Sequence, residues 1–161
     1  MRHVLITPLL VVSVSAALLV TPAVATPSGA NGLIYYVDLE SNLRAVSADG
    51  TPADIEPVAD VASVDVSPDG TQLLVRSTSG GLELRSTGGG EPRAIETGVE
   101  TVRSVTWAPD GQRFAFVGFA SGAINVYVSN LDGATPTNLT SGTGSQNQAP
   151  AWSPDGSTLY F

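Results

Sequence analysis

Apolar and polar residues alternate in short stretches along most of this chain. The segments Ser63–Val66 and Ser104–Trp107 both alternate, so every second side chain lies on the same side of an extended backbone. Such period-two segments predict strands with one buried face. No segment after residue 25 combines a helical period with helix-capping residues, as an amphipathic helix would. The pattern therefore predicts an all-β protein.

Three turns of similar composition interrupt the alternating segments, and their prolines lie 41 and then 45 residues apart. Proline presets φ, aspartate hydrogen-bonds the local backbone, and glycine supplies the positive φ that closes such a turn. The residues of these turns are Pro68, Asp69, Gly70, Pro109, Asp110, Gly111, Pro154, Asp155 and Gly156. A large apolar residue stands two positions before each proline. We expect these residues, Val66, Trp107 and Trp152, to occupy equivalent core positions.

A second series supports the first, because Pro52, Pro92 and Pro136 follow glycine-ended turns and lie 40 and 44 residues apart. Each repeat therefore contains four short strands. One strand precedes the Pro-Asp-Gly turn, one follows it, a third is exemplified by residues 124–128, and the last surrounds Ile95 or Leu139. Four-stranded units of this length are typical of β-propeller blades.

Residues 105–116, 124–133 and 151–161 closely resemble the repeat of the TolB-type β-propeller family. The resemblance covers most of residues 33–161. The first full repeat departs from it, with valine in the tryptophan position and three consecutive glycines in its exit turn. The resemblance implies antiparallel four-stranded blades without fixing a function. Members of this family include periplasmic TolB itself, propellers of prolyl-oligopeptidase-type enzymes and other exported proteins.

The repeats divide the chain into a partial blade at 33–60, blades at 61–101 and 102–148, and the start of a further blade at 149–161. This division predicts thirteen strands, slightly more than three blades, whereas closed propellers have about 4–8. We therefore expect an incomplete ring. The first explanation is a partial chain, the second is completion of the propeller by another copy of the chain, and the last is a freestanding three-blade monomer.

Residues 1–25 have the layout of a secretory signal peptide. A basic Met1-Arg2-His3 precedes a largely apolar run over 4–20, and Ala23-Val24-Ala25 forms a small-x-small cleavage pattern. An uncleaved membrane anchor is the alternative, but the run is at the short limit for a spanning helix. We predict cleavage after Ala25, a linker at 26–32, and an exported protein of the bacterial envelope, periplasmic or extracellular. No stable membrane span remains after signal removal.

The amino-acid composition limits which binding and catalytic sites the chain can form. The chain has 15 acidic and 7 basic residues, a formal net charge of −8, no cysteine and no lysine. This charge argues against nucleic-acid binding, which needs a basic face. Removal of the signal peptide also removes the single histidine, His3. Without His, Cys or Lys, the chain cannot form a Ser-His-Asp triad, a Cys-His pair, a histidine zinc site or a Schiff base. We expect no catalytic residue, no cofactor and no metal site.

Two sets of residues are candidates for a site. The turn aspartates Asp69, Asp110 and Asp155 either ring one face and bind a cation or stabilise their own turns, and the second reading is favoured. Trp107 and Trp152 either stack on a sugar or peptide or pack in the core, and their strand phase favours the core. The polar segment 141–148 is a loop or a contact surface. A pair of carboxylates of the kind that glycosidases use is a further alternative.

Two functional classes follow. The first is a non-catalytic binding module of the envelope, because propellers that resemble TolB present a rigid face or central channel to protein partners, and an acidic face steers basic partners. Self-association that completes the propeller belongs to this class. The second is the propeller part of an exported hydrolase or peptidase whose catalytic domain lies outside this chain.

Overall fold

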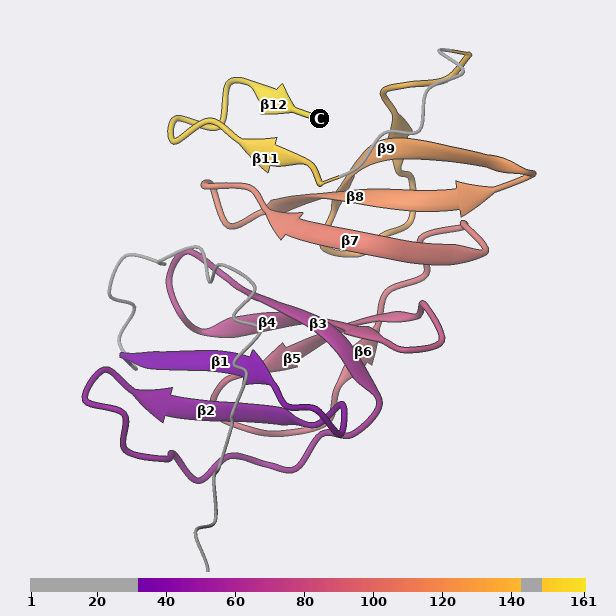
Figure 1. Ribbon diagram of the computed structural model, residues 1–161. Coiled ribbons are helices and arrows are strands. Elements are labelled where there is room, and N and C mark those ends of the chain that lie inside the picture. The colour runs from indigo at the N-terminus through magenta and orange to yellow at the C-terminus, as the bar shows by residue number, and fades with distance from the viewer. Residues whose placement is uncertain (1–31, 143–148) are drawn as a thin grey trace, which may run out of the picture.

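The computed structural model describes residues 32–142 and 149–161, which form four antiparallel β-sheets arranged one after another (Figure 1). The predicted signal peptide at 1–25 and nearly all of the linker at 26–32 lie outside the described residues. Among the residues that are described, no helix has the length and apolar character needed to cross a bilayer.

Two complete sheets form the middle of the molecule. The second sheet contains β3 (Val61–Val66), β4 (Gln72–Ser77), β5 (Leu82–Ser86) and β6 (Arg93–Ala94). The third sheet contains β7 (Thr101–Trp107), β8 (Arg113–Ala120), β9 (Ala123–Asn130) and β10 (Thr137–Asn138). Consecutive strands pair in both sheets, so the predicted all-β fold with four-stranded antiparallel blades is confirmed.

The outer sheets are smaller. The first pairs β1 (Leu33–Val37) with β2 (Leu43–Ser47), and the fourth pairs β11 (Ala151–Trp152) with β12 (Leu159–Tyr160). The third strand predicted within 33–60 is wrong, because that segment pairs only through an isolated bridge between Val46 and Pro52. Pro52 alone does not explain this, because the matching prolines Pro92 and Pro136 precede β6 and β10. Pro57 has no counterpart in the later repeats, and it lacks an N–H to donate to a ladder. The described residues thus contain twelve strands and no closed ring.

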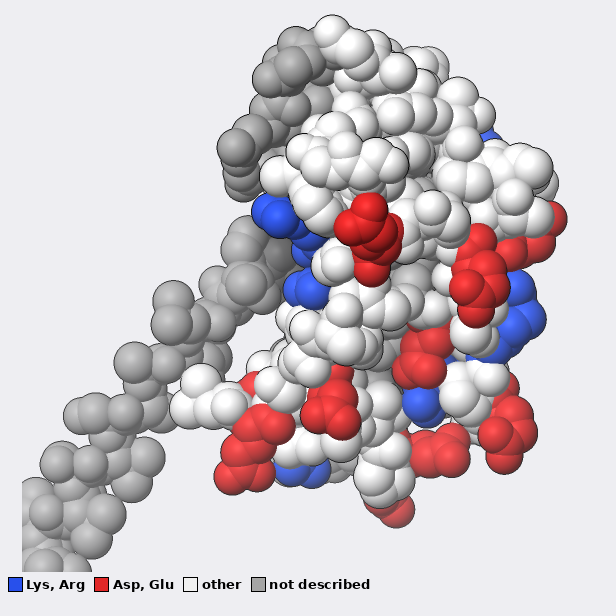
Figure 2. All heavy atoms as spheres, turned by 90° about the vertical axis from the view of Figure 1, so that its right-hand side faces the viewer, with Lys and Arg blue, Asp and Glu red and all other residues white. Residues whose placement is uncertain are grey.

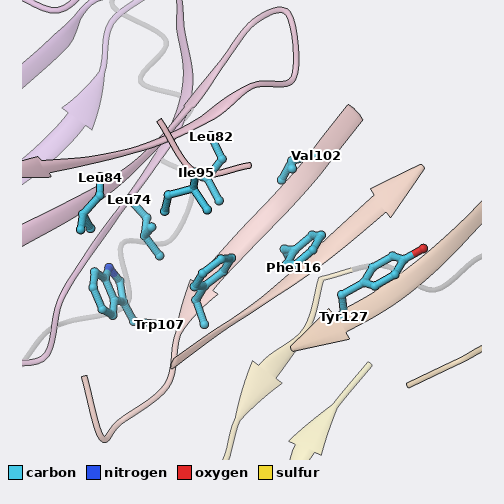
Figure 3. Packing of buried hydrophobic residues seen from close by; sticks show 9 residues of the cluster. Leu74, Leu82, Leu84, Ile95, Val102, Trp107, Phe116 and Tyr127 are labelled. Carbon is cyan, nitrogen blue, oxygen red and sulfur yellow. The ribbon is translucent and has the colours of Figure 1, made fainter. Parts of the chain in front are cut away.

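The core lies between the faces of successive sheets. One apolar cluster joins the first and second sheets, and a larger one joins the second and third (Figure 3). In β4, Leu73 and Val75 belong to the first cluster, whereas Leu74 belongs to the second. Both faces of this strand are therefore buried, which explains why its sequence is a continuous apolar run instead of an alternating one.

Backbone hydrogen bonds connect neighbouring sheets at equivalent places. The first residue of β3, Val61, donates from its N–H to the carbonyl oxygen of Ser41 at 2.8 Å, and Val102 at the start of β7 donates to Gly80 at 2.9 Å. In both inner strands, a register shift follows directly, between 61 and 63 and between 102 and 104. The same bulge and the same hydrogen bond therefore recur at the first two interfaces between sheets.

Candidate functional site

The Pro-Asp-Gly turns lie side by side along one edge of the stacked sheets, at the left of Figure 1. A Cβ placed on Gly111 would lie 3.8 Å from Pro68 Cδ, and one on Gly156 would lie 3.6 Å from Pro109 Cδ. The second and third turns therefore each pack their glycine against the proline of the preceding turn. We call residues 67–71, 108–112 and 153–157 together the turn row.

In the first and third turns of the row, the aspartate is held by its own turn. Asp69 accepts hydrogen bonds from Ser67 Oγ at 2.6 Å and from the N–H of Thr71 at 3.0 Å. Asp155 accepts from Ser153 Oγ at 2.6 Å and from the N–H of Ser157 at 3.0 Å. These bonds stabilise the charged form. They lower the pKa of Asp69 and bring the pKa of Asp155 to about 2.

The middle turn uses a different partner because alanine stands at position 108. Burial raises the pKa of the Asp110 carboxyl, but hydrogen bonds from the N–H of Gln112 and the side chain of Arg113 outweigh it, so the pKa is lowered. Arg113 Nε and Nη2 both lie 2.8 Å from Asp110 Oδ2. The same guanidinium lies 5.2 Å from the Trp152 ring centroid and thereby connects the turn row to the fourth sheet.

The geometry favours turn stabilisation over cation binding for the three aspartates. Each carboxylate is directed into its own turn by hydrogen bonds. In the part of the chain that the structure describes, no group of three Asp, Glu, His or Cys side chains is placed to hold a metal ion. The exposed carboxylates still make the turn row an acidic surface of fixed shape.

The residues that precede the three turns lie in different environments. Trp107 is buried in the cluster between the second and third sheets. Val66 is partly buried and packs against the cluster between the first and second sheets. Trp152 is half-buried, and its indole Nε1 has no hydrogen-bond partner among the residues that the structure describes. It lines an open hollow of about 500 Å³ with Leu159 and Phe161.

Asp65 is a contact residue that the sequence analysis did not single out. From β3 it accepts a hydrogen bond from the N–H of Trp107 at 2.7 Å, and its backbone oxygen accepts from Trp107 Nε1 at 3.2 Å. Burial raises the pKa of the Asp65 carboxyl, although hydrogen bonds from Trp107 and Val66 partly offset this. The sequence contains one sign of this role. The equivalent positions of the later repeats hold Thr106 and Ala151, so Asp65 is the one acidic residue at this repeat position.

This arrangement of side chains suits binding of a partner better than catalysis. The turn row presents exposed carboxylates, held in fixed orientations, next to exposed Thr71, Gln112 and Ser157. Charged hydrogen-bond acceptors of this kind bind cationic groups of a partner. The segment 141–148, predicted as a loop or contact surface, lies almost entirely outside the described residues.

No family model matches the sequence. An uncharacterized protein of Agrobacterium fabrum is 28% identical over 137 residues, which are 81% of this chain and 44% of that protein. The Tol-Pal system protein TolB of Alcanivorax borkumensis is 41% identical over 61 residues, 37% of this chain and 14% of that protein.

Solved structures show the same architecture. TolB from Acinetobacter baumannii has a TM-score of 0.66 at 20% identity, over 80% of this chain and 34% of that one. A TolB-like protein from Agrobacterium tumefaciens has a TM-score of 0.65 at 27% identity, over 79% and 49%. The β-propeller domain of the Trilobed protease from Pyrococcus furiosus has a TM-score of 0.53 at 13% identity, over 74% and 40%. The chain spans less than half the length of each of these proteins.

Proposed function

We propose that this chain, a segment of a TolB-type β-propeller, is a non-catalytic protein-binding module of the bacterial cell envelope. Its similarity to TolB proteins, over most of the chain in structure and over shorter stretches in sequence, supports the envelope location. The signal-peptide layout of residues 1–25 supports export. The absence of His, Cys and Lys after residue 25 supports a binding role over a catalytic one.

The turn row carries this proposal. Three turns pack directly against one another, so the carboxylates of Asp69, Asp110 and Asp155 have fixed relative positions. Preorganised groups lose little conformational entropy when a partner binds, which favours affinity. A rigid row of carboxylates therefore suits a partner that presents a series of Lys or Arg side chains.

Net charge agrees with a basic partner. The full chain carries a formal charge of −8, and loss of Arg2 with the signal peptide makes it more negative. Figure 2 shows the side of the molecule away from the turn row, where acidic and basic side chains are interspersed over the lower part. The negative net charge itself gives the molecule a negative field. Such a field accelerates association with cationic proteins, and the effect weakens as salt screens it.

A titration with a fluorescent lysine-rich peptide tests the proposal. We expect saturable binding that weakens with added salt, and a glutamate-rich peptide of equal length should not bind. Gln112→Lys places a cation in the middle of the turn row and should weaken binding about tenfold, as a charge placed against a charged partner does. Asp54→Asn makes the same change in net charge outside the row and serves as the matched control. Equal affinities for both variants would refute the turn row as the binding surface.

Export is tested separately. The chain is expressed in a bacterial host, the cells are fractionated, and the N-terminus of the accumulated protein is sequenced. We expect an envelope or medium fraction whose first residue is Thr26. An unprocessed chain in the cytoplasmic fraction would contradict export, and it would leave the result of the binding assay unaffected.

The alternative function is the propeller part of an exported hydrolase or peptidase. Its support is the fold likeness to the propeller domain of a protease. In that case, peptidase activity would belong to a catalytic domain joined to these sheets, and the lysine-rich peptide would be cleaved by the whole protein instead of being held intact.

A further inference from the structure

We propose that a cavity between the first and second sheets binds a free aliphatic α-amino acid, such as leucine, as a zwitterion. The cavity lies beside the exit turn of the second sheet, residues 86–90, and we call it the exit-turn cavity. All the residues that line it fall within 35–90. This inference goes beyond the binding role of the turn row and does not depend on it.

The exit-turn cavity combines an apolar floor with charged residues. Its volume is about 40 Å³, compared with about 30 Å³ for one water molecule in the liquid. Leu43, Val58 and Leu73 form part of the floor, and all three are buried. Arg85 and the exposed Glu56 also line the cavity. The space is therefore large enough for the tip of one aliphatic side chain, while polar groups of the same ligand lie at the charged residues.

The neighbouring interface between sheets has a leucine side chain at the equivalent place. Arg85 of β5 and Ser129 of β9 each pair with the residue three positions after a turn glycine, so Thr87 corresponds to Leu131. Leu131 packs against the cluster between the second and third sheets. Thr87 is smaller, and its hydroxyl donates to the carbonyl oxygen of Gly70 at 3.0 Å. The space that leucine fills at one interface is thus left open at the other.

The two exit turns also pack differently. A Cβ placed on Gly133, in the exit turn of the third sheet, would overlap the side chain of Ile95. A Cβ placed on the equivalent Gly89 would have Glu56 Oε2 as its neighbour, at 3.8 Å. Ile55, the counterpart of Ile95, is partly buried and lines the cavity. The exit turn of the second sheet therefore leaves aliphatic surface open to a ligand.

The charges at the cavity match both ends of a zwitterion. Arg85 Nε donates to Glu83 Oε1 at 2.6 Å, which holds the guanidinium in place, and the Arg85 side chain is 18% exposed. Within residues 32–142 and 149–161, no hydrogen bond occupies its two Nη atoms, so they can donate to a ligand carboxylate. Glu56 supplies a carboxylate for the ligand ammonium group.

Simpler aliphatic ligands would satisfy only part of this set. An aliphatic carboxylate would pair with Arg85, but it would also bring negative charge toward Glu56 and Glu83. An aliphatic amine would pair with Glu56 and leave the half-buried Arg85 guanidinium without an acceptor, which costs free energy. An aliphatic amino acid uses the apolar floor and both charges together.

NMR titration of the chain with L-leucine tests the proposal. We expect saturable shifts of the amide signals of Thr87, Gly89 and Gly90. Three probes each lack one part of leucine: glycine lacks the aliphatic tip, 4-methylpentanoate lacks the ammonium group, and 3-methylbutylamine lacks the carboxylate. Each of them should bind about tenfold more weakly than L-leucine or worse.

Two variants alter the cavity, and a third is the matched control. Thr87→Leu introduces the residue of the neighbouring interface, fills the cavity and should weaken L-leucine binding about tenfold. Arg85→Gln removes the cation and should have a similar effect on L-leucine but not on 3-methylbutylamine. Arg44→Gln removes an arginine from another ion pair, with Asp38, and should leave the affinity unchanged. Circular dichroism verifies folding, and Arg85→Gln alone decides if Thr87→Leu is unfolded.

The absence of saturable shifts at Gly89 and Gly90 would overturn the proposal, because the space would then be a packing defect filled by water. Equal affinities for glycine and L-leucine, or an L-leucine affinity unchanged by both cavity variants, would also overturn it. Gln112→Lys should bind L-leucine like the original chain, which keeps this test separate from that of the turn row.

Discussion

The interface between the second and third sheets is tightly packed, whereas the interface between the third and fourth is open, although the same repeat positions form both. At the first of these interfaces, Trp107 is 6% exposed and its indole N–H is bonded to Asp65. At the second, Trp152 is half-buried, and within residues 32–142 and 149–161 its indole N–H has no partner. The turns that follow the two tryptophans are nevertheless alike.

The difference arises from the residues that face each tryptophan. The second sheet offers large side chains, and the third offers smaller or less covered ones at the same positions. The two series are Leu74, Leu82, Leu84 and Ile95 against Ala115, Val126, Val128 and Leu139. Ile95 is 4% exposed and Leu139 is 44% exposed. A repeat motif thus determines the turn by itself, while burial of its tryptophan depends on the neighbouring sheet.

The largest effect should come from truncating equivalent side chains at the two interfaces. Phe114 and Leu159 occupy the same strand position, but Phe114 is fully buried and Leu159 is not. Phe114→Ala should destabilise the protein by about 3–5 kcal/mol, since it leaves a cavity in a closed core. Leu159→Ala should cost less than about 1 kcal/mol, because little apolar area is lost. Urea unfolding measures both, and equal losses would show that the two interfaces do not differ.

Replacing the two tryptophans tests the same difference between the two interfaces. Trp107→Phe removes the bond from Nε1 to the Asp65 carbonyl oxygen and should cost about 1–2 kcal/mol. Trp152→Phe removes a buried N–H that has no partner and should change the free energy of unfolding by about zero. The order of the two values in urea unfolding is the readout. A larger loss at Trp152 would contradict the structural assignment.

Asp65 should give the tight interface a pH dependence of its own. Burial raises its folded pKa above 3.8, so the folded state binds more protons than the unfolded state just above that pH. Stability from this group is therefore greatest at low pH and falls as the pH rises through the window above 3.8. Asp65→Asn keeps an acceptor for Trp107 and should flatten the profile above pH 3.8. An unchanged slope would show that Asp65 is not buried.

The smallest effect concerns the turn of the open interface. Asp155 has a folded pKa of about 2, below its ordinary value of 3.8. Its contribution to stability is therefore present above pH 3.8 and is lost as the pH falls toward 2. NMR titration of the carboxyl measures the pKa. Ser153→Ala should raise that pKa, because the hydroxyl is the main cause of the shift. An unshifted Asp155 would show that the turn needs a tight interface to form.

The sequence was sufficient for the repeat architecture. The Pro-Asp-Gly turns and the period-two segments depend on local backbone preferences, so two complete blades could be predicted with their strand order. The expected strand near Ile55 was wrong, because this segment pairs through only one bridge. Pro92 and Pro136 match Pro52 and still precede strands, whereas Pro57 has no counterpart in the later repeats and removes a backbone donor from this segment.

Contacts across sheets could not be predicted from one repeat. Asp65 stands at a polar position of an alternating strand, which normally indicates solvent, yet it accepts from Trp107, 42 residues away. Arg113 lies over Trp152 because the third sheet brings its turn beside the fourth. Both contacts depend on how the sheets pack against each other, and the period of the sequence carries no information about that arrangement.

The central claim is that the turn row is a single binding surface for a basic partner. Backbone NMR spectra of the chain during addition of the lysine-rich peptide test it most directly. We expect the amide signals of Thr71, Gln112 and Ser157 to shift together with one affinity, while those of Arg93 and Ala94 in β6 stay in place. Shifts confined to β6, or no shift at saturating peptide, would contradict the claim.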